Sequence, residues 1–164
     1  MTEETRKERQ WLQRFVGDWT FEVEGTAEEG KPAEKHPGTE TGRSLDGVWV
    51  ILEGESEMPG AGPIRSIMTL GFDETKGRYV GTYVASMMTY LWVYEGDLDA
   101  AGNVLTLETT GPSFTDEGKM ARYRDVIEFR SDDHRVMTSV TQGEDGQWTT
   151  VMEANYRRVT QAGS

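Results

Sequence analysis

The chain has 164 residues, no cysteine, 35% hydrophobic residues and a formal net charge of −12. A chain of this length buries roughly 70% of its unfolded surface on folding, so it can form a hydrophobic core or a binding pocket without disulfide bonds to stabilise it. Binding to nucleic acids or anionic membranes requires a positively charged surface, and the negative net charge argues against one. The missing cysteines exclude disulfides and thiolate metal sites. We therefore expect no nucleic-acid partner and no membrane partner.

Residues 3–16 predict one short amphipathic helix. Its apolar side carries Trp11, Leu12, Phe15 and Val16. Thr5 and Glu8 have the spacing of a capping box, Thr2 is an equally good N-cap, and Gly17 is a natural stop. A helix this short is not stable alone, so we expect its apolar side to cover another part of the fold.

The start of the chain predicts the compartment. The first ten residues are charged and contain no apolar segment of the kind found in signal peptides. No run approaches the ~18 apolar residues of a membrane-spanning helix. Together with the absence of cysteine, these features predict a cytoplasmic protein.

After Gly17 the hydrophobic pattern changes to a period of two, broken by turn signals rich in Gly, Pro, Asn and Asp. The strand-like runs lie near residues 18–26, 39–46, 48–58, 64–72, 78–86, 90–98, 103–110, 121–130, 134–142 and 147–157. About ten short strands without intervening helices predict an antiparallel sandwich or barrel. The polar stretch 27–38 is expected to be a mobile loop. We expect one domain over residues 1–164, with a helix at 3–16, a barrel at 18–158 and a short C-terminal tail.

Two short segments resemble the lipocalins and their calycin relatives. The segment "FVGDWTFEVEG" places Trp19 between the helix and the first strand, and "NYRR" places Arg157 and Arg158 in the last strand. In that group an arginine packs over the tryptophan and closes one end of the barrel. The resemblance therefore implies a barrel-closing pair of Trp19 and Arg157, with a cation–π contact of roughly 1 kcal/mol.

Four further segments are more specific: "MPGAGP", "SMMTYLWVYEGDLD", "GPSFTDEGKMARYRDVIEF" and "DDHR…GEDG". Together they resemble a bacterial domain-of-unknown-function family, number 1579, over nearly the whole chain from about Trp11 to Arg158. The resemblance implies an all-β fold, a single antiparallel lipocalin-like β-barrel of about ten strands with a short N-terminal helix. It implies no activity and no catalytic residue.

The segment from Ser86 to Glu95 is unusually aromatic for an acidic chain. Tyr90, Trp92 and Tyr94 alternate onto one face, while Met87 and Met88 fall in the preceding connection. Methionine adapts its flexible thioether to varied apolar guests. One hypothesis places the three aromatic residues in the barrel lumen and the two methionines on its lip. The alternative is that they fill the core or form a subunit contact.

The segment "ARYRDVIEF" carries a charge on a face that should be buried. Alternation turns Asp125 inward together with Tyr123 and Ile127. A buried carboxylate must be paired or protonated, and Arg43, in register with Leu45, is a candidate partner. Asp125 could then hold the polar head of a ligand or act as a general acid or base. The alternatives are a structural ion pair or an exposed carboxylate at a bulge.

The segment "DLDAAGNVLTLE" imitates a calcium-binding loop, with acidic residues at Asp97, Asp99 and Glu108. Ala101 occupies a position that should supply an oxygen ligand, and the flanking segments are strand-like. We therefore predict a hairpin turn here and no metal site.

The two histidines predict no haem site, because His36 is expected in the mobile loop and His134 in a turn. No nucleophile elbow and no phosphate loop is found, so no cofactor is expected. The long connection from Gly111 to Met120 carries Phe114, and one hypothesis makes it a lid over the mouth of the barrel.

Three functions remain open from the sequence. The preferred one is binding of a small apolar or amphipathic molecule in the lumen. The second is an enzyme with Asp125 as acid or base, which we favour less, and the third is a homo-oligomeric module, such as a homodimer, without a ligand. The candidate ligand-binding residues are Tyr90, Trp92, Tyr94, Met87, Met88, Tyr123, Asp125, Arg43, Met68 and Met152.

Overall fold

The computed structural model describes residues 3–25, 35–58, 62–113 and 116–159. Four sequence-based predictions concern other residues: the Thr2 cap, most of the expected loop 27–38, the Phe114 lid and the C-terminal tail. They lie outside the described residues, as does the side chain of Thr5.

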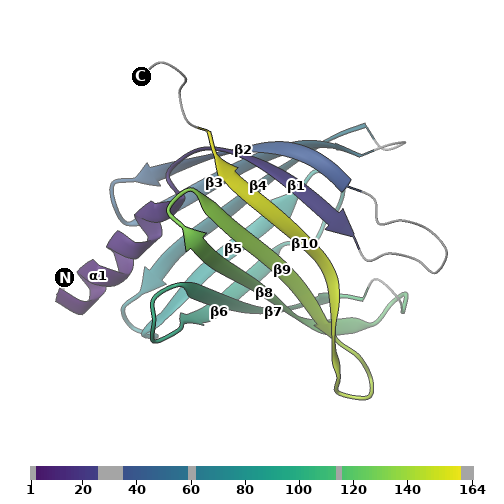
Figure 1. Ribbon diagram of the computed structural model, residues 1–164. Coiled ribbons are helices and arrows are strands. Elements are labelled where there is room, and N and C mark those ends of the chain that lie inside the picture. The colour runs from purple at the N-terminus through teal and green to yellow at the C-terminus, as the bar shows by residue number, and fades with distance from the viewer. Residues whose placement is uncertain (1–2, 26–34, 59–61, 114–115, 160–164) are drawn as a thin grey trace.

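Ten antiparallel strands form one closed barrel, as Figure 1 shows. The strands are β1 (Gly17–Gly25), β2 (Lys35–Leu45), β3 (Trp49–Met58), β4 (Gly62–Asp73), β5 (Arg78–Ala85), β6 (Trp92–Leu98), β7 (Val104–Pro112), β8 (Met120–Ser131), β9 (His134–Gln142) and β10 (Trp148–Arg158). Each strand pairs with the next along the chain, and β1 also pairs with β10 to close the sheet. The predicted fold class is therefore confirmed.

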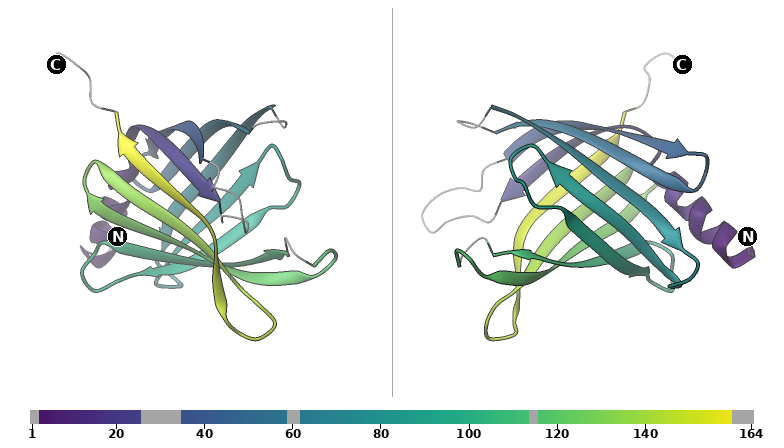
Figure 2. Two further views of the ribbon diagram at one scale, coloured as in Figure 1. Left: turned by 45° about the vertical axis from the view of Figure 1, so that its right-hand side comes forward. Right: turned by 180° about the vertical axis from the view of Figure 1, so that it is seen from behind.

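The predicted helix forms as α1 (Glu3–Leu12) followed by a single 3-10 turn, η1 (Gln13–Phe15). Both lie at one end of the barrel, which Figure 2 shows from two further sides and which we call the helix end. Trp11 donates from its indole nitrogen to the carbonyl of Gly102, in the turn between β6 and β7, at 2.7 Å. Leu12 and Phe15 are fully buried. The apolar side of the helix thus caps the barrel interior, because no strand covers that end.

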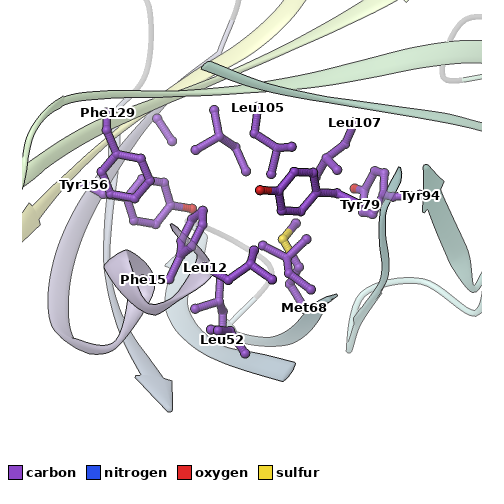
Figure 3. Packing of buried hydrophobic residues seen from close by; sticks show 14 of the residues in the cluster. Leu12, Phe15, Leu52, Met68, Tyr79, Tyr94, Leu105, Leu107, Phe129 and Tyr156 are labelled. Atoms are coloured by element: carbon purple, nitrogen blue, oxygen red, sulfur yellow. The ribbon is translucent and has the colours of Figure 1, made fainter. Parts of the chain in front are cut away.

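Buried side chains from the helix and the strands pack together in the core, part of which Figure 3 shows. Phe15 packs edge-on against Phe129 with 5.0 Å between ring centroids, and Trp11 lies 5.8 Å from Tyr79. The Tyr79 hydroxyl donates to the Glu8 carboxylate at 2.5 Å, which ties the helix to β5. A Cβ at Gly42 would overlap the carbonyl oxygen of Phe15, so this glycine lets η1 lie directly on β2.

Arg158, and not Arg157, closes the helix end. The Arg158 guanidinium lies 4.3 Å from the Trp19 ring centroid and donates to the carbonyls of Val16 and Arg14 at 2.6 and 2.9 Å. Trp19 itself is almost fully buried. Arg157 is exposed, so assigning it to Trp19 was wrong.

The reason is register. Trp19 is directly opposite Arg158 across the β1–β10 ladder, whereas Arg157 is opposite Thr20 on the outer face. Gly17 makes the contact possible, because it has a φ of +130° and a Cβ there would overlap the Arg158 Nη1 atom.

In the described part of the chain, neither helical segment has the length and apolar character that a membrane crossing requires.

Candidate functional site

A cavity of about 190 Å³ lies inside the barrel. It begins at Phe15 under the helix end and reaches Met87, in the connection between β5 and β6 at the opposite end. The apolar part of its wall comes from Phe15, Phe21, Val23, Leu52, Ile64, Met68, Met87, Ile127, Met137 and Met152. A guest would therefore touch thioethers and aromatic rings as well as aliphatic side chains.

The polar part of the wall includes a buried ion pair. The Arg135 guanidinium, on β9, donates from Nη2 to Oε1 of Glu40 on β2. Their side chains are only 3% and 10% exposed. Removal from water raises the pKa of the Glu40 carboxyl, and the adjacent guanidinium acts in the opposite direction.

Aromatic rings surround the same guanidinium. Its central carbon lies 4.1 Å from the Tyr156 ring centroid, 4.4 Å from Trp19 and 5.0 Å from Phe15. Each ring face attracts the cation, and the effect grows when water is excluded. The Nη1 atom of Arg135 is buried and has no hydrogen-bond partner among the described residues. This guanidinium is therefore held on one edge by Glu40 and unpaired at Nη1.

Sequence reasoning missed both Arg135 and Glu40. The signal was present for Arg135, because it alternates with Met137 and Ser139 along β9, and Met137 lies inside the barrel. Glu40 had no such signal, since its neighbours on β2 are small and polar. Only the pairing of β1 with β10, which closes the sheet, brings β2 and β9 close enough for these two side chains to meet.

Tyr83 and Ser66 add two hydroxyl groups to the wall. Burial raises the pKa of the Tyr83 phenol, and a hydrogen bond with Ser66 partly offsets this effect. These hydroxyls give the cavity further polar positions beside Arg135.

Three of the sequence-predicted residues, Met68, Met87 and Met152, form part of the cavity wall. Met68 is buried, whereas Met87 is 55% exposed and stands at the mouth. A methionine at the mouth can move aside without breaking a strand, because the connection that carries it lies between β5 and β6.

Asp125 faces inward, but it is held by hydroxyl groups and does not line the cavity. Tyr94 donates its hydroxyl to Oδ2 at 2.6 Å, and Ser139 donates to Oδ1. Burial raises the pKa of the Asp125 carboxyl, while these two hydrogen bonds lower it. Both carboxylate oxygens are thus occupied by the protein itself.

Arg43 is not the partner of Asp125, so that expectation was wrong. Its side chain is exposed on the outer face and forms an ion pair with Glu53, with 2.6 Å between Nη2 and Oε1. Alternation explains the error, because Gly42 occupies the inward position beneath Phe15 and sends Arg43 outward.

The aromatic residues of the Ser86–Glu95 segment pack on one another instead of facing the cavity. The Trp92 ring lies 5.0 Å from Tyr90 and 5.2 Å from Tyr123, between ring centroids. Both tyrosines donate their hydroxyls to backbone carbonyls of β7, at 2.9 and 2.7 Å. Met88 accepts a hydrogen bond from the Trp92 indole at 3.0 Å. None of these four side chains lines the cavity in the described part of the chain.

His36 lies in β2 and lines the cavity, so its expected place in a mobile loop was wrong. The backbone pairs His36 with Val23 of β1, and this pairing extends β2 into the stretch that composition alone describes as loop. His134 begins β9, and its Nε2 lies 3.0 Å from Oδ1 of Asn155. Among the described residues, no three His, Asp or Glu side chains gather closely enough to hold a metal ion.

The segment that imitates a calcium loop is a hairpin turn between β6 and β7, as predicted. Oδ1 of Asp99 accepts hydrogen bonds from the backbone nitrogens of Asn103 and Val104, at 2.9 and 3.0 Å. These hydrogen bonds lower the pKa of Asp99. The carboxylate therefore stabilises the turn.

Larger hollows of about 850 and 720 Å³ lie elsewhere, but they are open to solvent and follow the outside of the sheet. Outward residues such as Thr39 and Glu57 line one, and Val93 and Glu95 line the other. A surface furrow excludes little water from a guest, so the inner cavity is the stronger candidate site.

Solved structures with this fold have little sequence in common with the chain. A structure of Rv2717c from M. tuberculosis is 12% identical, with a TM-score of 0.64 over 92% of this chain and 96% of that one. The S-type phycobiliprotein lyase CPES from Guillardia theta is 13% identical, with a TM-score of 0.61 over 98% and 99%. Both likenesses are evidence for the barrel fold alone.

A comparison with curated proteins finds no match. The family described as "Protein of unknown function (DUF1579)" matches residues 4–158, which include α1 and every strand of the barrel. The chain belongs to this family.

Proposed function

We propose that this protein binds one small, predominantly apolar molecule in the inner cavity of the barrel. The observation that carries the proposal is the cavity itself, about 190 Å³ inside an otherwise packed core. Protein interiors contain few voids larger than a water molecule. An engineered apolar cavity of about 150 Å³ binds benzene, so the available space fits a single ring with a short substituent.

The composition of the wall supports the same proposal. Four methionines and two phenylalanines face the space, and such side chains gain affinity by contact area without demanding one shape. The cavity is smaller than the roughly 300 Å³ at which pockets for drug-sized ligands begin, which argues for a compact guest. The relative named as a phycobiliprotein lyase shares only the fold, so the argument depends on this chain's own cavity.

Catalysis by Asp125 has weaker support than binding. A general acid or base must reach the proton that it transfers, and Asp125 forms no part of the cavity wall. Its two oxygens accept hydrogen bonds from Tyr94 and Ser139. The carboxyl is better explained as a polar brace between β6, β8 and β9.

The test combines identification of co-purified compounds with a defined probe. Native mass spectrometry of the purified protein, followed by solvent extraction, detects any resident guest. Ethylbenzene is then titrated into the stripped protein, and we expect the melting temperature to rise as ligand binding stabilises the folded state.

A matched pair of variants locates the binding site. Ser56→Leu places a larger side chain in the cavity wall, whereas Thr20→Leu adds a leucine to the exposed face of β1. We expect Ser56→Leu to abolish the ethylbenzene response and Thr20→Leu to retain it. An equal response in both variants, or no guest and no response in the unaltered protein, would contradict the proposal.

A further inference from the structure

Glu40 is the member of the buried ion pair that a guest can reach. Its side chain is 10% exposed, against 3% for Arg135, and the Nη1 atom of Arg135 has almost no accessible surface. Glu40 lines the cavity. Opposite it across the β2–β3 ladder is Gly54, which also lines the cavity and has no side chain to cover the carboxylate. A guest in the cavity therefore meets the carboxylate before the guanidinium.

Only one oxygen of the Glu40 carboxylate has a partner in the described part of the chain. Oε1 accepts a hydrogen bond from Nη2 of Arg135, and no described residue donates one to Oε2. Burial raises the pKa of the Glu40 carboxyl more than the adjacent guanidinium lowers it, so Arg135 compensates this charge only in part. A buried polar atom without a partner is costly, and native proteins leave few of them. Oε2 is therefore an open acceptor on the cavity wall.

The charges inside the barrel favour a cation at this acceptor. Among the described residues of the interior, the two carboxyls of Glu40 and Asp125 accompany one guanidinium, and the hydrogen bonds of Asp125 come from hydroxyl groups. After burial, which is the largest cause, the charges of Asp125 and Glu40 raise the pKa of the Tyr83 phenol, which lines the same cavity. An anionic guest would be repelled here, whereas a cation would balance the second carboxyl.

An aromatic ring lies beside the open acceptor. Gly38 precedes Glu40 by two residues on the same face of β2, and a Cβ at Gly38 would overlap the Phe21 ring. This ring also lines the cavity. Because aromatic rings attract cations, Phe21 adds to the attraction that the carboxylate exerts on a positively charged group.

Arg135 does not exclude a second cation. Its guanidinium binds Oε1 and lies 5.0 Å or less from three aromatic ring centroids. A carboxylate accepts hydrogen bonds at both of its oxygens, so Glu40 can lie between two cations, one at Oε1 and one at Oε2.

From this arrangement we infer that the guest is a small apolar amine whose ammonium group donates a hydrogen bond to Oε2 of Glu40. The rest of the guest lies against Phe21 and the methionines of the wall. The inference rests on the proposed binding function and adds the class of ligand: a primary amine on a compact aromatic or aliphatic body.

The experiment compares four probes of similar size and different charge: ethylbenzene, benzyl alcohol, benzylamine and benzoate. Benzyl alcohol is a neutral hydrogen-bond donor, whereas benzylamine is a cation in neutral solution. Affinities are measured by calorimetry at about pH 8, where a histidine side chain is ordinarily neutral and benzylamine is still largely protonated. This pH is chosen because His36 is the other basic residue among the described residues of the wall.

A matched pair of variants separates the charge of Glu40 from the charge of the whole chain. Glu40→Gln keeps an oxygen that accepts the hydrogen bond from Arg135, but it places an NH2 donor where Oε2 was. Glu57→Gln is the control, since it removes one negative charge from an exposed residue of β3 that does not line the cavity. The affinity of each variant for ethylbenzene shows whether its cavity is intact.

In the unaltered protein, benzylamine should bind more tightly than benzyl alcohol, and benzoate should bind at least about tenfold more weakly than benzylamine. Glu40→Gln should lower the ratio of the benzylamine affinity to the ethylbenzene affinity at least about tenfold, the effect of losing one hydrogen bond between charged groups. Glu57→Gln should leave this ratio unchanged, because salt screens an exposed charge outside the cavity.

Three results would each overturn the inference: benzylamine binding no more tightly than benzyl alcohol, benzoate binding more tightly than benzylamine, or an affinity ratio that Glu40→Gln does not change. The first two need no variant, so they decide the matter even if Glu40→Gln does not fold. If ethylbenzene binds while one of these results appears, the binding function stands and the class of ligand is wrong. If no probe binds, the proposed function itself fails, and the inference fails with it.

Discussion

Arg157 and Arg158 are adjacent at the end of β10, but replacing each with methionine should change the free energy of unfolding by very different amounts. Arg158→Met keeps the apolar stem over Trp19 but removes the two bonds to the carbonyls of Val16 and Arg14. Hydrogen bonds from a charged donor contribute about 1.5 kcal/mol or more each. Loss of the cation over the indole ring adds about 1 kcal/mol.

The free energy of unfolding should therefore fall by about 4 kcal/mol in Arg158→Met, which corresponds to roughly 10 °C in melting temperature for a chain of this size. Arg157→Met should change it by less than about 0.5 kcal/mol, as is usual for an exposed site without such contacts. Urea unfolding followed by tryptophan fluorescence measures both, and an unchanged m-value shows that the comparison concerns stability alone.

Two equally small losses would refute the reasoning, because they would mean that the barrel end does not depend on this guanidinium. A larger loss in Arg157→Met would refute the register on which the assignment depends.

Two further perturbations test the interior. Burial raises the pKa of Asp125 above its ordinary value of 3.8, so its contribution to stability is fully present below that value and is lost as the pH rises through the folded-state pKa. Asp125→Asn, which cannot ionise, should therefore become progressively more stable relative to the unaltered protein as the pH rises from about 4 to about 8. Urea unfolding over this pH range measures the difference in stability between the two proteins. A difference that does not change with pH would contradict the prediction. Gly42→Ala should lower stability by about 1–3 kcal/mol, since its Cβ would overlap the Phe15 carbonyl and lift η1 from β2. Gly143→Ala, at an exposed turn, is the control in thermal unfolding, and equal melting temperatures would show that η1 tolerates displacement.

The periodicity of the sequence was sufficient to predict the strands. Alternating apolar positions and turn signals located all ten within a few residues, because each strand must present one face to the interior. The same rule turned Asp125 and Met68 inward correctly. The prediction for His36 was wrong because it was based on composition and not on alternation. The proline and glycine residues near His36 are typical of a loop, but this stretch pairs with β1.

The cavity was decided by tertiary structure. Tyr90, Trp92 and Tyr94 have the residue types of a binding site, yet they fill the interior between β6, β7 and β8 by packing on their neighbours. The space that remains lies elsewhere in the lumen, where the small residues Gly54 and Ser56 of β3 and Ser66 of β4 line it.

The sequence by itself therefore determined the antiparallel strands, the helix that packs against them and most of the inward-facing positions, since these follow from local alternation, while the closed barrel was implied by the family resemblance. Only the tertiary structure decided that Glu40 meets Arg135 and that Arg158 covers Trp19. Those contacts join residues about 95 and 139 positions apart, and such pairs depend on the register in which the sheet closes, which no local pattern specifies.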